Sequence, residues 1–358
     1  MFTNANIEGS CGWDRSKVKN KFYCGINRIP EVFLLEVCDF NERCNMPNKV
    51  LDAIMGSCVA DALGVPVEFT SRHSLANNPV VNMRSCGTFN LPAGTWSDDT
   101  SMTLCLLDSL SKGLDYQDIM TKFYEWFDAS AYTPYGETFD VGFSTTKAMK
   151  RFAYGIAPLE CGGTSEQDNG NGSLMRILPV LFYLQSVFGN DFLKNENSFE
   201  IIHNVSALTH AHKRSQIACG IYISIAVMLG RKVQIADAVK QGIELAFEFY
   251  EKTPEFAEEL SYFDRLAAKN FAEIHEDEIK SSGYVVDTLE ASIWCLLNTN
   301  NYHDCVLKAV NLGEDTDTVA AVAGGLAGLY YGYENIPEEW VATIARREFI
   351  EDLCGRVV

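Results

Sequence analysis

The chain has 358 residues, of which 47% are apolar and 22% are charged, so it can bury a sizeable core. Aspartate and glutamate total 48 against 29 lysines and arginines, and the formal net charge is −19. This surplus of negative charge excludes duplex nucleic acid and membranes as expected partners, because phosphate-rich surfaces are bound largely through clustered Lys and Arg.

The 12 cysteines are scattered without a CxxC pair, and several lie inside apolar runs. Buried cysteine behaves as a small hydrophobe, and a chain of this length needs no disulfides to fold. The N-terminus has no basic stretch followed by an apolar run, so we expect no signal peptide. We therefore expect a reducing, cytoplasmic environment.

Residues 1–48 differ in pattern from the rest of the chain. They show no sustained 3.6-residue period, and they contain the cysteines at positions 11, 24, 38 and 44. The spacing of these cysteines departs from the paired pattern typical of zinc sites, which disfavours a zinc site there. We interpret residues 1–48 as an N-terminal extension of unknown role that packs on the main domain.

From Lys49 onward, apolar residues recur at helical spacing. The run from 49 to 63 has small residues that permit close packing, and Gly64 is expected to end it. Further helical runs cover about 100–111, 116–127, 175–188, 198–229, 235–250, 284–297, 302–311 and 317–331. Strand patterns are scarce, and the longest strongly apolar segment, Ile217 to Leu229, is shorter than the roughly 20 residues of a membrane span. The sequence predicts an all-α, compact, many-helix orthogonal bundle over residues 49–358.

The first unusual motif, Ser97-Asp98-Asp99-Thr100, comes directly before an apolar helix. One such residue is enough to cap a helix, because its side chain accepts a hydrogen bond from a free N–H group. Three in a row exceed that role, and adjacent carboxylates repel one another unless a cation lies between them. Capping alone remains the alternative to a cation site.

The second acidic motif, residues 313–318, opens another helix of small residues. Asp315 and Asp317 are two positions apart, which suits a loop around a metal better than a helix face, where neighbours are three or four apart. Hard oxygen ligands favour magnesium, manganese or calcium over zinc. If the two motifs meet across the bundle, they supply four carboxylates, enough for two divalent cations in one cleft.

Two weaker motifs lie between the acidic ones. Residues 168–176 form a glycine-rich loop that is expected to run into a helix, where backbone N–H groups can approach a phosphate. Asn-Gly pairs also make ordinary turns, so this signal is weak alone. In Thr209-His210-Ala211-His212, the two histidines are expected on different faces of a helix, and a lone histidine is more often a satisfied polar group than a functional one.

Together these motifs resemble the ADP-ribosylglycohydrolase family, of the type that activates dinitrogenase reductase. The resemblance spans about residues 49–335 and follows the family order of five motifs. These are residues 56–69 (GSCVADALGVPVEF), 97–100 (SDDT), 170–176 (GNGSLMR), 209–210 (TH) and 313–318 (GEDTDT). Five motifs in order are far more specific than any one of them.

The resemblance implies an all-α fold with a dinuclear magnesium or manganese centre. Its implied metal ligands are Ser97, Asp98, Asp99, Asp315, Asp317 and Thr318. It also implies that Glu68 is a metal-proximal acid/base or gating residue, with Asp98 and Asp99 as the further catalytic candidates. Asn169, Gly170, Asn171 and His210 would line the ADP-ribose cleft. Family members commonly have Thr where this chain has Ser97, and because the hydroxyl is kept we expect the metal site to be kept.

The implied reaction is hydrolysis of the bond between the distal ribose C1 of ADP-ribose and an acceptor. We expect the substrate to be an ADP-ribosylated protein or a small ADP-ribosyl compound, and the enzyme to be a monomer. Arginine is the first acceptor expected, while serine, another amino acid and O-acetyl-ADP-ribose remain open.

Three alternatives have different chemistry. A non-catalytic ADP-ribose-binding or crystallin-like relative is disfavoured because both acidic motifs are intact. An HD-type phosphohydrolase would need convincing metal ligands around His303-Asp304. An isoprenoid synthase would need a DDxxD motif, whereas Asp98-Asp99 is followed by Thr-Ser-Met.

Overall fold

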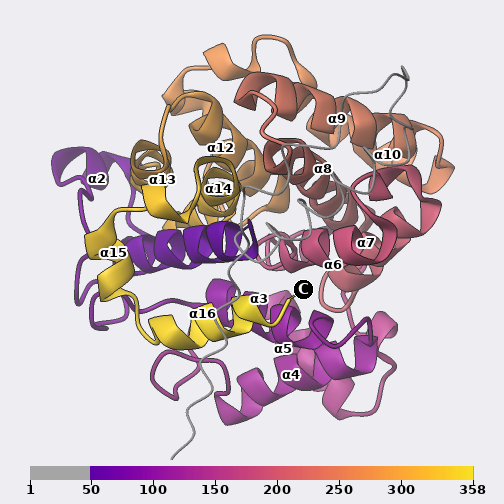
Figure 1. The fold of residues 1–358 in the computed structure, drawn as a ribbon, viewed down its shortest axis with the longest axis horizontal. Coiled ribbons are helices and arrows are strands. Elements are labelled where there is room, and N and C mark those ends of the chain that lie inside the picture. Colours follow the sequence, from indigo (N-terminus) through magenta and orange to yellow (C-terminus); the bar gives the residue numbers. More distant parts are fainter. Residues whose placement is uncertain (1–48, 358) are drawn as a thin grey trace, which may run out of the picture. The chain divides into compact units, whose positions relative to one another are not determined.

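A computed structural model of the protein describes residues 49–357, and this part of the chain is helical (Figure 1). Between these residues the structure has three isolated β-bridges and no strand. The predicted all-α class is therefore confirmed. Residues 1–48, including the four cysteines considered for zinc, lie outside the described part.

The first described helix covers residues 49–64 and continues into η2 (Val65–Val67). The longer helices that follow are α3 (Asp98–Leu110), α4 (Tyr116–Ala129), α5 (Phe143–Ala153), α6 (Pro179–Phe188), α7 (Glu196–Ala207), α8 (Lys213–Gly230), α9 (Ile235–Glu251), α12 (Val285–Leu297), α13 (Tyr302–Asn311), α14 (Thr316–Tyr331) and α16 (Arg347–Gly355). Short helices between them include α2 (Arg72–Asn77), α10 (Pro254–Leu260), α11 (Asp264–Ala267), α15 (Glu338–Thr343) and η4 (Glu166–Asp168).

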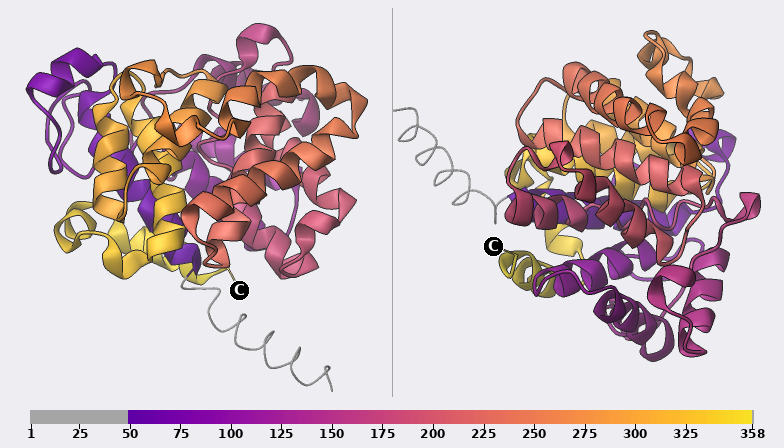
Figure 2. Two further views of the ribbon diagram at one scale, coloured as in Figure 1. Left: turned by 90° about the horizontal axis from the view of Figure 1, so that it is seen from above. Right: turned by 90° about the vertical axis from the view of Figure 1, so that its right-hand side faces the viewer.

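Three helices form the centre of this bundle. In α8 every residue from Arg214 onward is buried, and in α14 the residues from Thr316 to Leu329 are buried. A helix that is apolar all round is expected to be enclosed on all sides. The 49–64 helix is the third: Lys49–Val67 is long and apolar enough to cross a bilayer, but 89% of its apolar window is buried inside the fold. It is therefore a core helix, drawn in indigo between α14 and α3 in Figure 1 and enclosed by other helices in Figure 2.

Glycines let the 49–64 helix touch α14 backbone to backbone. A Cβ atom added to Gly56 would lie 2.5 Å from the Gly324 carbonyl oxygen. Gly64 is the last α-helical residue before η2, as expected, and its φ of −79° is right-handed. Its role is close approach, because a Cβ atom there would lie 2.3 Å from Cα of Asp317. The glycine thereby sets the position of the second acidic motif.

Two predicted helical boundaries are wrong. The run 198–229 is divided into α7 and α8 by a loop that contains both His210 and His212, so the expected helical faces for them do not exist. This loop pairs with Gly163, whose N–H donates to Thr209 O and whose carbonyl accepts from Ala211 N. The run expected from 175 begins as a helix only at Pro179, and the glycine-rich loop before it forms turns. Proline suits the first position of a helix, because its missing N–H group would have no partner within the helix there.

Candidate active site

The two acidic motifs meet at the N-terminal ends of α3 and α14. Thr318 Oγ1 donates a hydrogen bond of 3.1 Å to Asp99 Oδ2, across 219 positions of sequence. Asp98 and Asp99 lie in the first turn of α3. Asp317 lies in the first turn of α14, two residues after Asp315 at its N-cap. The sequence-based expectation that these motifs converge is therefore correct.

Asp61, from the 49–64 helix, holds the start of α3 in place. Both of its carboxylate oxygens accept from the Ser97 N–H at 3.1 Å, and Oδ2 also accepts from the Thr100 N–H at 3.1 Å and the Thr100 hydroxyl at 2.5 Å. Burial raises the pKa of Asp61 to about 6 even though these hydrogen bonds oppose the shift. Asp61 and Ser97 thus satisfy the helix start, and capping does not explain the carboxylates of Asp98 and Asp99.

The buried carboxylates have oxygen atoms without hydrogen-bond partners. Glu68 Oε2, Asp99 Oδ1 and Asp317 Oδ2 are buried and accept no hydrogen bond within the described part of the chain. Burial, reinforced by the negative charge of neighbouring carboxylates, raises the pKa of Asp98, Asp99 and Asp317 well above the usual range. Several unpaired carboxylates in a dry site are costly unless cations compensate them. The donor set therefore fits hard divalent cations.

Asp140 belongs to this cluster although the sequence motifs did not include it. Glu68, Asp140 and Asp317 each offer a carboxylate oxygen, and these oxygens lie within 4.8 Å of one another. Asp140 lies in the loop between α4 and α5 and has a φ of +54°, a left-handed conformation that is uncommon outside glycine. Burial, opposed by a hydrogen bond with Glu68, raises its pKa.

The segment that carries Glu68 is tied to the loop that carries Asp315. The Phe69 N–H donates to Glu314 O at 2.7 Å, and the Glu314 N–H donates to Thr70 O at 2.8 Å. Arg72 adds a hydrogen bond from Nε to Leu312 O at 2.8 Å. Phe69 and Glu314 both have a φ of +62°. These bonds hold Glu68 against the start of α14.

A cleft with a volume of about 340 Å³ opens beside the acidic cluster. Its wall contains six of the predicted site residues with carboxylate, amide, hydroxyl or imidazole side chains, together with Gly170, Asp140 and the two exposed aromatic residues Phe69 and Phe143. The six are Glu68, Asp98, Asn171, His210, Asp315 and Thr318. Ser97, Asp99 and Asp317 are buried next to this wall.

Asn171 and Asn169 have different positions in the glycine-rich loop. Asn171 Nδ2 donates to Asp315 Oδ2 and to Thr288 Oγ1, each at 2.9 Å, so it connects the loop to the second acidic motif. Asn169 was expected to line the cleft, but its side chain accepts from Ser215 Oγ at 3.1 Å and donates to Glu166 O at 3.1 Å. These contacts make it a support of the loop.

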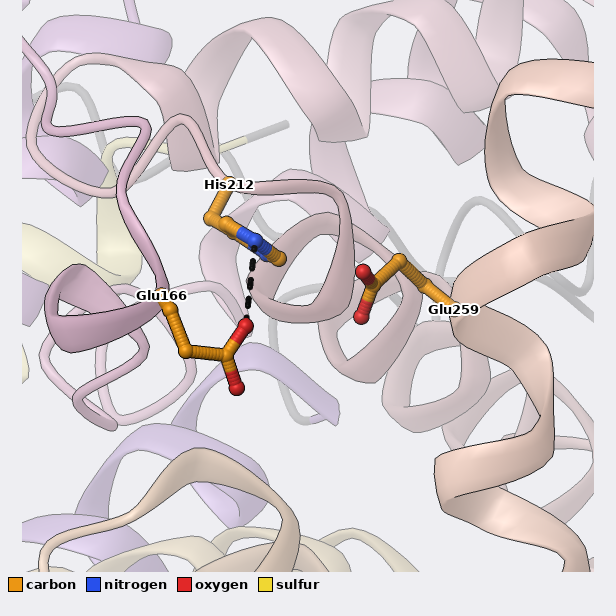
Figure 3. A group of neighbouring side chains, drawn as sticks. All are labelled: Glu166, His212 and Glu259. Carbon is orange, nitrogen blue, oxygen red and sulfur yellow. Dashed lines mark ion pairs between the residues drawn. The ribbon is translucent and has the colours of Figure 1, made fainter.

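A second group of potential metal ligands, Glu166, His212 and Glu259, comes from η4, the start of α8 and α10 (Figure 3). Arg214 already pairs with both carboxylates, at 2.6 Å from Glu166 Oε1 and 2.8 Å from Glu259 Oε2. His212 Nδ1 accepts from the Arg214 N–H at 3.2 Å, which places the imidazole proton on Nε2 and removes that nitrogen as a ligand. The group is an ion-pair network that fastens η4 beside the cleft.

Fold and site together define an all-α class of protein with an acidic cleft at two helix starts that could hold cations. The family described as ADP-ribosylglycohydrolase matches residues 44–358. The ADP-ribosylarginine hydrolase of Serratia proteamaculans is 32% identical over 87% of this chain and 79% of its own length. The ADP-ribosyl-[dinitrogen reductase] glycohydrolase of Rhodospirillum rubrum is 29% identical, over 83% and 90% respectively.

A solved structure titled ADP-ribosylglycohydrolase-related protein complex superimposes with a TM-score of 0.71 at 28% identity, covering 87% of this chain and 98% of that one. The chain belongs to the ADP-ribosylglycohydrolase family. It is a hydrolase with ADP-ribosyl glycohydrolase activity, and its acidic clusters could hold metal.

Proposed function

We propose that the protein removes ADP-ribose from arginine side chains with the help of two divalent cations, Mg²⁺ or Mn²⁺. The observation that carries the cation proposal is the set of buried carboxylate oxygens without hydrogen-bond partners, on Glu68, Asp99 and Asp317. When bound, divalent cations would supply Lewis-acid contacts that orient the distal ribose through its hydroxyls. The proposed ligands are Ser97, Asp98, Asp99, Asp315, Asp317 and Thr318.

Glu68 and Asp140 are the side chains we assign to proton transfer. Both line the cleft, whereas Asp99 is almost completely buried beside Thr318. Burial, together with the negative charge of Asp140 and Asp315, raises the pKa of Glu68 to about 10. A carboxyl group with a raised pKa can hold a proton near neutral pH and give it to a leaving group. Asp98, which also lines the cleft, is the next candidate for this role.

Arginine as the acceptor is supported by the chemistry of the cleft wall. Glu68 and Asp140 line the same cleft as the aromatic residues Phe69 and Phe143, which are 69% and 73% exposed. A guanidinium group pairs with carboxylates and stacks on aromatic faces, whereas a serine hydroxyl gains neither contact. The relative from Serratia proteamaculans is named for ADP-ribosylarginine.

The test is a panel of peptides ADP-ribosylated on arginine, serine or cysteine, incubated with Mg²⁺ while free ADP-ribose is measured. We expect release from the arginine peptide to be the fastest. A Phe69→Leu variant keeps an apolar side chain but loses the ring, so it should raise KM for the arginine peptide by several-fold. Faster release from serine would contradict the arginine proposal. Binding of ADP-ribose without release from any peptide would support the non-catalytic alternative.

A further inference from the structure

His210 lies in the cleft wall with its two ring nitrogens in different surroundings. Its Nδ1 is 2.8 Å from the Thr209 hydroxyl oxygen, and this oxygen accepts a hydrogen bond of 2.7 Å from Arg176 Nη2. His210 is 3% exposed, and Thr209 and Arg176 are completely buried. Its Nε2 faces the glycine-rich loop, where a Cβ atom added to Gly172 would lie 3.3 Å away.

The direction of the hydrogen bonds along this chain follows from the chemistry of its three members. A guanidinium only donates, so the Thr209 oxygen is the acceptor from Arg176. The hydroxyl proton of Thr209 then needs an acceptor, and among the described residues only His210 Nδ1 is placed to accept it. The reverse arrangement would leave a buried hydroxyl proton unpaired, at a cost of about 1–3 kcal/mol. Nδ1 is therefore the acceptor, and the imidazole proton is on Nε2.

We propose that Thr209 and Arg176 are positioning residues that hold His210 in the Nε2–H form, so that Nε2 donates a hydrogen bond to an oxygen of bound ADP-ribose. This inference rests on the proposed function, because it takes ADP-ribose as the occupant of the cleft. The ligand atom is an acceptor oxygen, as carried by the diphosphate and the ribose hydroxyls. Within the described part of the chain, no residue accepts a hydrogen bond from Nε2.

The surroundings keep His210 neutral and in place. Burial, reinforced by the positive charge of Arg176, lowers the pKa of His210 to about 3. The Nε2–H group can therefore donate a hydrogen bond while the ring is neutral. The charge of the ring does not change across neutral pH. A Cβ atom added to Gly172 would lie 2.8 Å from His210 Cε1, so the loop and the ring fit closely.

Arg176 is an unusual residue for a purely structural role. Its Nε and Nη1 are buried without hydrogen-bond partners, and its guanidinium lies 4.5 Å from the centre of the Phe123 ring. Burying a charge with unpaired N–H groups is costly, and an apolar residue of similar size would often be at least as stable. The hydrogen bond from Nη2 to the Thr209 oxygen accounts for the buried guanidinium of Arg176. Because Arg176 can only donate, the hydroxyl proton of Thr209 is left to point toward His210.

The experiment compares wild type, Thr209→Val and Thr209→Ser, all as the full chain. Selective ¹⁵N labelling of histidine reports the tautomer of each ring in NMR spectra, and the loss of one set of signals in His210→Gln assigns His210. Calorimetry with ADP-ribose in Mg²⁺ gives the affinity. We expect the Nε2–H form in wild type and Thr209→Ser, with similar Kd values.

In Thr209→Val, which has no hydroxyl, we expect a mixture of tautomers and a Kd raised roughly 10-fold, as for the loss of one hydrogen bond to a ligand. An Nδ1–H form in wild type would overturn the inference, and so would a Thr209→Val variant with unchanged tautomer and Kd. Thr209→Ser is the control, because it changes the side chain but keeps the hydroxyl. Normal ADP-ribose affinity in this variant would show that the loss in Thr209→Val comes from the missing hydroxyl and not from disturbed folding. A wild type with the Nε2–H form that binds no ADP-ribose would instead overturn the proposed function.

Discussion

Asp317 and Glu68 are neighbouring buried carboxylic acids whose contacts differ. Asp317 is completely buried at the start of α14, and its Oδ1 accepts from the Thr318 N–H at 2.9 Å. Glu68 is 5% exposed and lines the cleft. In the proposed mechanism Asp317 therefore holds a cation, whereas Glu68 transfers a proton.

Replacing each acid by its amide tests this division. Asp317→Asn removes a negative charge from a proposed ligand, so it should weaken Mn²⁺ affinity and, through it, ADP-ribose affinity. Glu68→Gln should keep ADP-ribose affinity within a few-fold while turnover falls by roughly 10²- to 10⁴-fold, the range for losing a general acid or base. Calorimetry and steady-state kinetics on both variants measure this. Near-normal turnover in Glu68→Gln would leave proton transfer to Asp140 or Asp98. Combined loss of metal and ADP-ribose binding would instead make Glu68 a metal ligand.

The sequence predicts residues of the site where the signal is local. Ser97, Asp98 and Asp99 stand together at a helix start, so their excess over a simple cap is visible in the chain itself. Asp140 is a lone acid in an irregular loop, and it becomes part of the site only because α4 and α5 bring that loop to Glu68. Asp61 lies inside an apolar run. Its role depends on contacts with Ser97 and Thr100, which lie 36 and 39 positions further along the chain.

At the scale of elements, the crossing of the 49–64 helix with α14 sets the geometry of the site. Gly64→Ala would place a methyl group against the backbone of Asp317, where a Cβ atom has only 2.3 Å to Cα. We expect a loss of about 1–3 kcal/mol in the free energy of unfolding, typical of overpacking, and a fall in turnover as the acidic motif shifts. Gly355→Ala is the matched control, because a Cβ atom there meets nothing within 4 Å. Denaturant unfolding and kinetics measure both variants, and wild-type behaviour of Gly64→Ala would refute the positional role.

A buried ion pair joins α3 to α4. Asp108 is 5% exposed and lies 2.7 Å from Lys122 Nζ and 2.8 Å from the Tyr132 hydroxyl. Burial alone would raise the pKa of Asp108, but the hydrogen bonds from Lys122 and Tyr132 outweigh it and lower the pKa to about 2. Because the folded pKa lies below the unfolded value, the stabilisation is complete above about pH 4 and is lost as the pH falls toward 2.

Asp108→Asn should therefore cost roughly 2–3 kcal/mol of unfolding free energy near neutral pH, and the difference from wild type should shrink between about pH 4 and pH 2. Urea unfolding of both proteins from pH 7 downward measures this difference. A gap that stays constant with pH would show that packing, and not the carboxylate charge, carries the contribution of Asp108.

Long helices with a sustained apolar period, such as α9 and α12, lie close to their predicted bounds. The first residues of α5 line the cleft, but the spacing of apolar residues in the sequence did not reveal this helix. It has few buried residues and a polar composition. The break between α7 and α8 was hidden because apolar residues continue on both sides of the His210 loop. The backbone pairing with Gly163 and the cap that the His212 side chain gives to α8 separate the two helices there.

At the scale of the whole molecule, the site is made by segments that are far apart in the chain. The 49–64 helix, α3, the Asp140 loop, the glycine-rich loop and α14 each contribute to one cleft, so the fold as a whole is needed to assemble it. The family match begins at residue 44. The role of residues 1–48, the monomeric state and the cytoplasmic location stay predictions from the sequence.

The central claim is that this acidic cleft hydrolyses ADP-ribosyl bonds only with divalent cations bound. The most direct test is the release of ADP-ribose from an ADP-ribosylarginine peptide by wild type, after treatment with excess chelator and then after addition of Mg²⁺ or Mn²⁺. The three unpaired buried carboxylate oxygens predict that turnover is abolished by the chelator and restored by the cation. Full turnover in excess chelator would contradict the claim.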